Sequence, residues 1–210
     1  MRGRMIPDAY GKSRVCNLYF DTPDFRIIRR SLEKPVYKEK LRLRSYGPVG
    51  ADGTVFAELK KKYQSVVYKR RATMKRDGAM EFFRAPDPHT QIERELAYFL
   101  TVNPTAEPMI WLSYAREAFF GANNPDFRMT FDTDVLARWD DLTLGGGIYG
   151  APVLPQGKVL MEAKVADAMP LWLTNTLSAA GIRPTSFSKY GTAYLQKQET
   201  GLLTGGQHYA

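Results

Sequence analysis

The sequence predicts an antiparallel α+β fold, and two observations lead to this prediction. Several segments alternate between apolar and polar residues with a period of two, which is the spacing of a half-buried strand. Short turns join most of these segments, and only a few stretches have helical spacing, so strands follow one another instead of alternating with helices. No internal repeat or long Pro- or Gly-rich stretch divides the chain. We therefore expect one domain over residues 1–198, followed by a flexible tail over residues 199–210.

The period-two segments are expected to be strands: Tyr37–Ser45, Val55–Lys62, Val66–Met74, Ile110–Phe119, Phe127–Val135 and Lys158–Ala166. The segments expected to be helices are Gln91–Leu100, Pro170–Ala180 and Lys189–Gln198. Pro170 stands where the first turn of a helix accepts proline, and Gly181 ends that helix. The run Gly145-Gly146-Gly147 lacks the strand-to-helix context of a dinucleotide-binding loop, and we expect a mobile loop there.

Composition points to an anionic partner and excludes several kinds of site. Lys and Arg total 30 against 22 Asp and Glu, so the formal net charge of the 210 residues is +8. The single cysteine, Cys16, rules out an intramolecular disulfide and is expected to be a small buried side chain in a protein of a reducing compartment. His89 and His208 lie too far apart in loop-like sequence to suggest a histidine-based zinc site. No apolar run approaches the ~20 residues of a membrane span, so we expect no membrane insertion and a cytoplasmic location.

The polar faces of the expected strands carry an unusual charge pattern. In an ordinary half-buried strand the polar face mixes Thr, Ser, Lys and Glu. In KEKLRLR the side chains at alternate positions are all cations, and the other five strands also place at least one cation on the polar face. The charged residues concerned are Lys38, Lys40, Arg42, Arg44, Glu58, Lys60, Lys62, Lys69, Arg71, Arg116, Arg128, Asp132, Lys158, Glu162 and Lys164.

Two interpretations of this pattern stay open at this point. In the first, the cations lie on solvated faces and protect strand edges, which is common in antiparallel sheets. In the second, the sheet closes into a barrel with the cations inside, where a bound polyanion offsets their repulsion and the carboxylates hold a divalent metal. Arginine pairs bidentately with phosphate oxygens, and this favours phosphate as the anion.

The aromatic residues of these strands argue against nucleic acid as the partner. Single-stranded nucleic acid is normally bound by aromatic side chains interleaved with cations. Tyr37, Phe56, Phe127 and Phe131 are expected to fall mostly on the opposite, core-facing side of their strands. The basic face is therefore expected to suit phosphates and not bases.

Several segments in a fixed order resemble the VTC domain, which belongs to the triphosphate tunnel metalloenzymes, a group that also contains the CYTH phosphatases. The segments are NLYFDTPDF (17–25), YKEKLRLRSYG (37–47), FAELKKK (56–62), REAFFG (116–121), FRMTFDT (127–133), LMEAKV (160–165) and SFSKYGTAYL (186–195). An ExK triplet alone is a weak signal, whereas this ordered combination over residues 5–195 is specific.

The resemblance implies an eight-stranded antiparallel β-barrel tunnel with a few short helices. It also implies transfer of the γ-phosphate of ATP to a growing polyphosphate chain, with release of ADP and with Mn²⁺ or Mg²⁺ as cofactor. The implied partners are thus ATP and inorganic polyphosphate.

The resemblance also implies roles for individual residues. The residues matched to the family's catalytic cations are Arg42, Arg44, Lys60, Arg116, Arg128 and Lys189. Those expected to bind substrate phosphate are Lys40, Lys69, Arg71, Lys164 and Ser188. Glu162 is the principal candidate for a metal ligand, with Glu58 and Asp132 as further candidates.

The beginning of the sequence departs from the family pattern. Family members usually carry a further strand with a lysine-bearing motif, and then a helix, before the segment that corresponds to YFDT. Here the residues before that segment are MRGRMIPDAYGKSRV, which match neither element. Two interpretations follow: either the start of the sequence is truncated or mis-assigned, or the tunnel lacks its first strand and some phosphate ligands, which would leave an unpaired edge.

Other functions of the same fold are a tripolyphosphatase or nucleoside triphosphatase, or a non-catalytic module that binds polyphosphate or inositol polyphosphates. Hydrolysis calls for carboxylates that activate water, and cations outnumber carboxylates on the expected inner faces, which favours the polymerase. A pure anion binder gains nothing from a carboxylate such as Glu162 beside bound phosphate, whereas a metal-dependent enzyme needs one.

Overall fold

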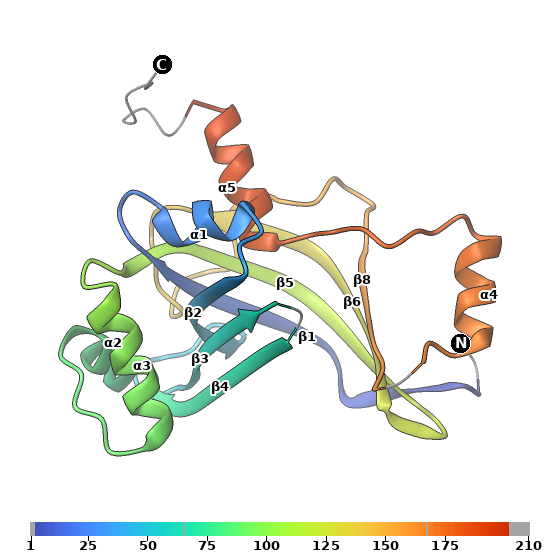
Figure 1. The fold of residues 1–210 in the computed structure, drawn as a ribbon, viewed down its shortest axis with the longest axis horizontal. Coiled ribbons are helices and arrows are strands. Elements are labelled where there is room, and N and C mark those ends of the chain that lie inside the picture. The colour runs from blue at the N-terminus through green and yellow to red at the C-terminus, as the bar shows by residue number, and fades with distance from the viewer. Residues whose placement is uncertain (1–2, 65, 167, 202–210) are drawn as a thin grey trace.

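The computed structural model describes residues 3–64, 66–166 and 168–201, and it has one strongly curved antiparallel sheet with helices on its outer face and at one end (Figure 1). Its strands are β1 (Met5–Asp21), β2 (Tyr37–Tyr46), β3 (Thr54–Tyr63), β4 (Val66–Lys75), β5 (Glu107–Gly121), β6 (Asn124–Arg138), β7 (Ala151–Pro152) and β8 (Leu160–Lys164). Its helices are α1 (Arg26–Leu32), α2 (Arg76–Arg84), α3 (Gln91–Val102), α4 (Leu171–Ala179) and α5 (Lys189–Glu199). The α+β class and the antiparallel pairing expected from the sequence are confirmed.

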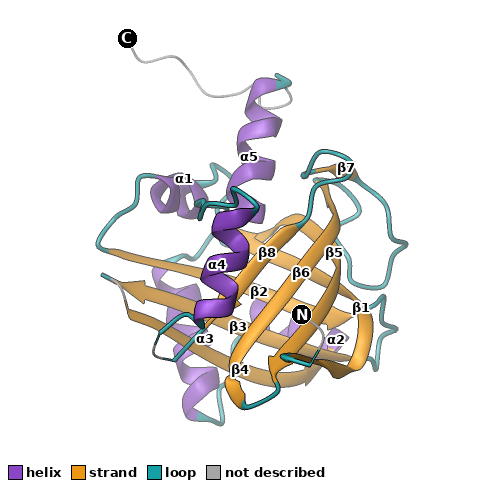
Figure 2. Ribbon diagram, turned by 90° about the vertical axis from the view of Figure 1, so that its right-hand side faces the viewer, coloured by secondary structure: helices purple, strands orange, loops and turns teal. Residues whose placement is uncertain are grey.

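The strands lie in the order β4-β3-β2-β1-β5-β6, and both β7 and β8 then pair with β6. The expectation of a closed barrel was wrong for the described residues, because β4 and β8 form separate edges and do not pair with each other. Alternation of side chains along a strand determines which face is polar, but it does not determine whether the two edge strands meet. Figure 2 shows the resulting curved wall of strands.

Three expected strands and all three expected helices lie close to their predicted bounds, and other elements differ. β5 and β6 extend beyond the predicted strands at both ends, and β8 is shorter than Lys158–Ala166. The sequence analysis missed β1, the two-residue strand β7, α1 and α2. β1 runs without interruption into the YFDT segment, so the residues before that segment form the beginning of the central strand itself. Of the expected tail 199–210, residues 202–210 lie outside the described residues.

The outer face of the sheet is apolar and is covered by helices. Helices α2 and α3 pack on β2, β3 and β4, where Leu41, Leu43 and Leu59 are completely buried. Cys16 belongs to the same cluster, as expected. Helix α4 packs on the outer face of β5, β6 and β8, with Trp172 against Phe127. Because the apolar side chains of both halves are buried on the outer face, the side chains that alternate with them are directed to the inner face.

Helices α1 and α5 close one end of the inner face. They pack on Ile110, Leu112 and Tyr114 of β5. Asp21, the last residue of β1, accepts hydrogen bonds from the backbone N–H groups of Ile27 and Ile28 at 2.8 and 2.9 Å and from the hydroxyl of Tyr190 at 2.9 Å. This buried carboxylate therefore caps the beginning of α1 and joins it to α5. None of the described helices has the length and apolar character needed to cross a membrane.

The segment with the three glycines is organised around a buried arginine. The guanidinium of Arg138, which is 3% exposed, donates hydrogen bonds to the carbonyl oxygens of residues 141, 143, 147 and 149. It also lies between two aromatic rings, 3.8 Å from the centroid of Trp111 and 4.4 Å from that of Tyr149. The conformation of residues 140–149 therefore depends on one side chain whose planar fork reaches several acceptors at once.

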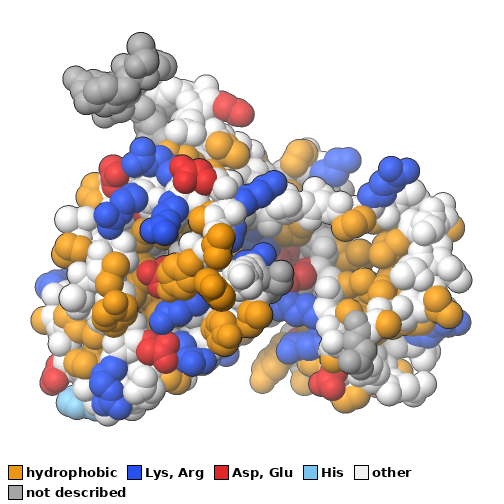
Figure 3. Space-filling view, viewed as in Figure 1, with side chains coloured by type: hydrophobic (Ala, Val, Ile, Leu, Met, Phe, Trp, Pro, Cys, Tyr) orange, Lys and Arg blue, Asp and Glu red, His pale blue; other side chains and the backbone are white. Residues whose placement is uncertain are grey.

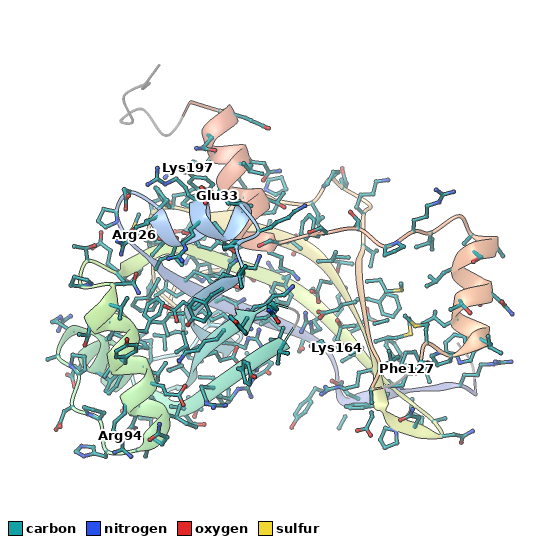
Figure 4. All side chains as sticks on the ribbon, viewed as in Figure 1. Arg26, Glu33, Arg94, Phe127, Lys164 and Lys197 are labelled. Atoms are coloured by element: carbon teal, nitrogen blue, oxygen red, sulfur yellow. The ribbon has the colours of Figure 1, made fainter. Side chains whose placement is uncertain are left out.

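We expect the substitution Arg138→Lys to lower the free energy of unfolding by about 2–4 kcal/mol, because a lysine keeps the charge but leaves partly buried carbonyl groups without donors. Chemical denaturation of the purified protein measures this change. Arg94→Lys, at an exposed position of α3 (Figure 4), is the control and should change stability by less than about 0.5 kcal/mol. Equal stability of the Arg138→Lys variant and the parent would contradict the role assigned to Arg138.

Candidate functional site

The inner face of β2, β3 and β4 carries charged residues in register across the three strands. Arg42 of β2 lies opposite Glu58 of β3, which lies opposite Arg71 of β4. The next row consists of Lys40, Lys60 and Lys69. Because residues directly opposite one another on neighbouring strands are only about 5 Å apart, the second row brings three like charges together. This arrangement is unfavourable unless anions lie nearby.

Glu58 is the anion at the centre of these rows. Its side chain is 2% exposed and is within salt-bridge distance of four cations. Oε2 is 2.7 Å from a terminal guanidinium nitrogen of Arg42 and 3.7 Å from one of Arg44. Oε1 is 2.8 Å from Nζ of Lys69 and accepts a hydrogen bond from Nε of Arg71, also at 2.8 Å. We call Glu58, Arg42, Arg44, Lys69 and Arg71 the Glu58 cluster.

The charge state of Glu58 follows from this environment. Burial by itself raises the pKa of a carboxyl group, but the positive charges of Arg42, Arg44 and Lys69 outweigh it and hold the pKa of Glu58 well below its ordinary value. The carboxylate is therefore ionised, and its cluster has a formal charge of +3 from four cations and one anion.

A second buried carboxylate, Asp132 of β6, organises cations on the other half of the sheet. Arg116 of β5 donates to it through Nε at 2.6 Å and through a terminal nitrogen at 2.8 Å, which is a bidentate pair. Nζ of Lys189, the first residue of α5, lies 2.6 Å from Oδ2. Burial again opposes ionisation, and the contacts with Arg116 and Lys189 lower the pKa of Asp132 despite it. Asp132, Arg116 and Lys189 form the Asp132 cluster.

Aromatic rings lie beneath the cations of both clusters. Arg71 lies 4.7 Å from the ring centroid of Phe56, and Arg42 lies 5.6 Å from that of Tyr19. Arg116 and Lys189 share the ring of Tyr114, at 5.0 and 4.4 Å. The expectation that Phe56 faces the core was therefore wrong: it lies one row from Glu58, and residues two apart on a strand share a face. Since cations already cover these rings, the rings hold arginines in position and are not free to stack on bases.

Lys40 and Ser188 connect the basic rows to α5. Nζ of Lys40 donates a hydrogen bond to Oγ of Ser188 at 3.2 Å, and the same Oγ accepts from the backbone N–H of Gly191, so that Ser188 caps α5. Burial lowers the pKa of Lys40 to about 8, although the nearby Tyr19 acts in the opposite direction. Lys40 is thus a cation that can lose its proton close to neutral pH.

The edge strand β8 supplies Glu162 and Lys164. Glu162 lies opposite Thr130 and Lys164 lies opposite Arg128, so all four share the inner face. In Figure 4, Lys164 lies on the side of β8 that faces β2–β4, whereas Phe127 lies toward α4. The carboxylate of Glu162 is 53% exposed, with Nζ of Lys164 at 3.5 Å from Oε1. Arg128 lies over the ring of Phe120, 4.5 Å from its centroid.

Of the acidic residues on the inner face, Glu162 is the one whose surroundings suit a metal ion. Among the described residues no group of three or more His, Cys, Asp or Glu side chains lies close enough to hold a metal ion. Glu58 and Asp132 are surrounded by cations, whereas Glu162 is half-exposed. One carboxylate together with phosphate oxygens of a substrate is a common set of ligands for Mg²⁺. The residues therefore fit a divalent metal that is held jointly by Glu162 and a bound phosphate chain.

The structure brings the predicted site residues to one face, in two clusters and a flanking strand. Lys60 also lies on this face, between Lys40 and Lys69, but its side chain is exposed and forms no salt bridge among the described residues. Sequence reasoning missed Tyr19, whose hydroxyl accepts a hydrogen bond from Arg42 at 2.8 Å, and Asn17, whose Oδ1 accepts one from Arg44 at 3.3 Å. Both residues alternate with the apolar residues of β1. If residues 16–20 are recognised as a strand, this alternation assigns Asn17 and Tyr19 to the face opposite the apolar one.

Figure 3 shows a hollow near the middle of the molecule with Lys and Arg side chains along it. Two cavities, of about 400 and 590 Å³, lie elsewhere. The first is between α2 and residues 142–144, and the second is between β6, β7 and residues 154–159. Neither is lined by the cations of the two clusters, so the basic inner face and not a closed pocket is the candidate site.

Comparison with known proteins gives a family and a fold. The sequence profile of the VTC domain matches residues 3–197. No curated protein sequence shows significant similarity to the chain. A solved structure from Bacillus halodurans, provisionally described as an adenylate cyclase, has a TM-score of 0.54 with 13% identity over 86% of this chain and 81% of its own. Another structure with that provisional description, from Vibrio parahaemolyticus, has a TM-score of 0.43 with 12% identity over 90% of this chain and 84% of its own.

The lowered pKa of Lys40 predicts that phosphate binding depends on pH. With a pKa of about 8, Lys40 is mostly protonated at pH 7 and mostly neutral at pH 9, so its attraction for an anion is lost as the pH rises. If only the protonated form binds well, the affinity for tripolyphosphate should fall about tenfold over this range. Isothermal titration calorimetry at several pH values measures the affinity. The Lys40→Arg variant should show a much flatter profile, because arginine keeps its charge. Identical profiles for the variant and the parent would exclude Lys40 as the cause.

Proposed function

The chain belongs to the VTC domain family, and from that premise we propose that it is a polyphosphate polymerase, which transfers the γ-phosphate of ATP to the end of a growing polyphosphate chain and releases ADP. The observation that carries the proposal is the gathering of cations on the inner face of the sheet. They form the Glu58 cluster on β2–β4 and the Asp132 cluster on β5, β6 and α5, and Arg128 of β6 and Lys164 of β8 share the same face. This arrangement supports a substrate that carries several phosphates.

The reaction requires positioning and charge neutralisation more than acid–base chemistry. An oxygen of the terminal phosphate of the chain attacks the γ-phosphorus of ATP, a new P–O–P bond forms, and the bond to the β-phosphate bridging oxygen breaks to leave ADP. The attacking phosphate is already ionised near neutral pH, so no strong base is needed. This is consistent with a face that offers arginines and lysines.

In our proposal the two clusters bind different parts of the substrate. The Glu58 cluster, with a formal charge of +3, suits the most highly charged part of the substrate, which is the triphosphate. The Asp132 cluster and Arg128 lie toward Glu162 and suit the phosphates that join or leave. Bidentate contacts and aromatic rings hold several of these arginines in place before the substrate binds, which favours in-line geometry.

A divalent metal, Mn²⁺ or Mg²⁺, completes the proposed site. When bound, such an ion neutralises charge on the phosphate oxygens and fixes their orientation. Glu162 is the residue that would hold it, because its carboxylate is exposed on the inner face.

The same face argues for polymerisation over hydrolysis. A hydrolase of this fold would need a carboxylate that is free to activate water. Glu58 and Asp132 are both engaged by cations, and their pKa values are lowered, so they are poor proton acceptors. Because Glu162, the exposed carboxylate of this face, is assigned to the metal, the face favours transfer to another phosphate over transfer to water.

The proposal is tested by incubating the purified protein with ATP and Mn²⁺ and identifying the products. We expect ADP together with long-chain polyphosphate. Arg42→Ala and Glu162→Gln should each lower the rate at least about a hundredfold, because the first removes a positive charge that stabilises the transferring phosphate and the second removes the carboxylate that would hold the metal. Circular dichroism of the same samples checks that both variants are folded.

The matched control is Lys61→Ala. Lys61 lies on the same strand and has the same charge as Lys60 and Lys62, but it is on the outer face, where it pairs with Glu95 at 3.2 Å. Its substitution should leave the rate within about twofold of the parent, since the charge is remote from the inner face. ADP with only free phosphate would identify a hydrolase, and binding of polyphosphate without any turnover would identify a binding module; either result would refute the polymerase.

A further inference from the structure

Two buried carboxylates on a face that binds phosphate need an explanation. Glu58 and Asp132 have side chains that are only 2% exposed, and each lies beside cations that we assign to phosphate binding. A carboxylate next to bound phosphate weakens phosphate binding by repulsion, so its presence calls for another role. Binding a metal would be one such role, but among the described residues neither carboxylate belongs to a group of three or more acidic, His or Cys side chains.

The contacts of Glu58 occupy the same donors that a phosphate would use. Arg42 directs Nε and a terminal nitrogen to Oε2, at 2.9 and 2.7 Å. Arg71 directs Nε and a terminal nitrogen to Oε1, at 2.8 and 2.5 Å. In each pair two guanidinium nitrogens share one carboxylate oxygen, and the same nitrogens are the donors that guanidinium groups offer to phosphate. Asp132 receives a bidentate contact from Arg116, with one nitrogen to each carboxylate oxygen, and a lysine contact from Lys189.

We propose that Glu58 and Asp132 are internal counter-ions. In the free protein they hold the cations of the inner face in position, and the phosphates of the substrate compete with them for those cations. They are thus positioning residues and not metal ligands. This inference rests on the proposed function, because it takes a phosphate chain as the ligand of the inner face.

The proposal has a consequence for affinity and another for stability. An arginine fork that is paired with Glu58 is available to phosphate only when that pair opens, so the apparent affinity is reduced by the fraction of open pairs. Removal of the negative charge should therefore strengthen phosphate binding. In the absence of phosphate, the same change leaves four cations close together without an anion, and this destabilises the fold.

The variant Glu58→Gln keeps the shape of the side chain and removes its charge. Binding of inorganic tripolyphosphate is measured by calorimetry in the absence of divalent metal, and the melting temperature is measured with and without tripolyphosphate. We expect binding that is roughly tenfold tighter than in the parent, since an internal competitor is gone. We also expect a lower melting temperature without the ligand and a larger rise when the ligand is added.

The control variant is Glu95→Gln. Glu95 also pairs with two cations, Lys61 and Arg70, at 3.2 and 2.9 Å, but these contacts lie on the outer face beside α3. Its substitution should leave the affinity for tripolyphosphate unchanged. Asp132→Asn is a second test of the same idea and decides the question if Glu58→Gln does not fold; it too should bind tripolyphosphate more tightly than the parent.

Each other outcome overturns the inference in a recognisable way. A lower melting temperature with unchanged tripolyphosphate affinity would show that the carboxylates have a purely structural role. Unchanged binding without metal but weaker binding with Mn²⁺ would show that they are metal ligands. If the unaltered protein does not bind tripolyphosphate at all, it is the proposed function that fails, which separates that result from a failure of the counter-ion role.

Discussion

The pairing of a buried carboxylate with several cations is the interaction on which the rest of this structure depends. Lys40, Lys60 and Lys69 lie next to one another across three strands, and Arg42 and Arg71 flank Glu58 in the row beside them. Without an anion such a face would drive the strands apart. Glu58 and Asp132 supply that anion inside the sheet, and the apolar outer face, packed on α2, α3 and α4, holds the strands together from the other side.

The inner face and the end helices are built as one unit. Asp21 terminates β1, caps α1 and accepts a hydrogen bond from Tyr190 of α5. The first turn of α5 in turn carries Ser188 and Lys189 to the basic face, where they meet Lys40 and Asp132. The carboxylate of Asp21 thus caps α1 and, through Tyr190, helps to position the residues that α5 contributes to the basic face.

The sequence predicted which side chains share a face but not how the strands are arranged. Alternation is a local property, so Arg42, Arg128 and Glu162 could be assigned to the inner face from their neighbours alone. The approach of Lys189 to Asp132 depends on contacts between distant segments, and so does whether the edge strands of the sheet meet; alternation specifies neither. Phe56 was misassigned because its aromatic side chain suggested the core, although its position two residues from Glu58 places it on the basic face.

In our proposal a chain of phosphates lies along the inner face, with a metal at Glu162 and none at Glu58. A crystal structure of the protein with tripolyphosphate and Mn²⁺, with anomalous scattering used to locate manganese, is the decisive test. We expect phosphates in contact with Arg42, Arg71 and Arg116 and manganese bound by Glu162. Manganese bound by Glu58 or Asp132, or phosphate bound away from the inner face, would contradict it.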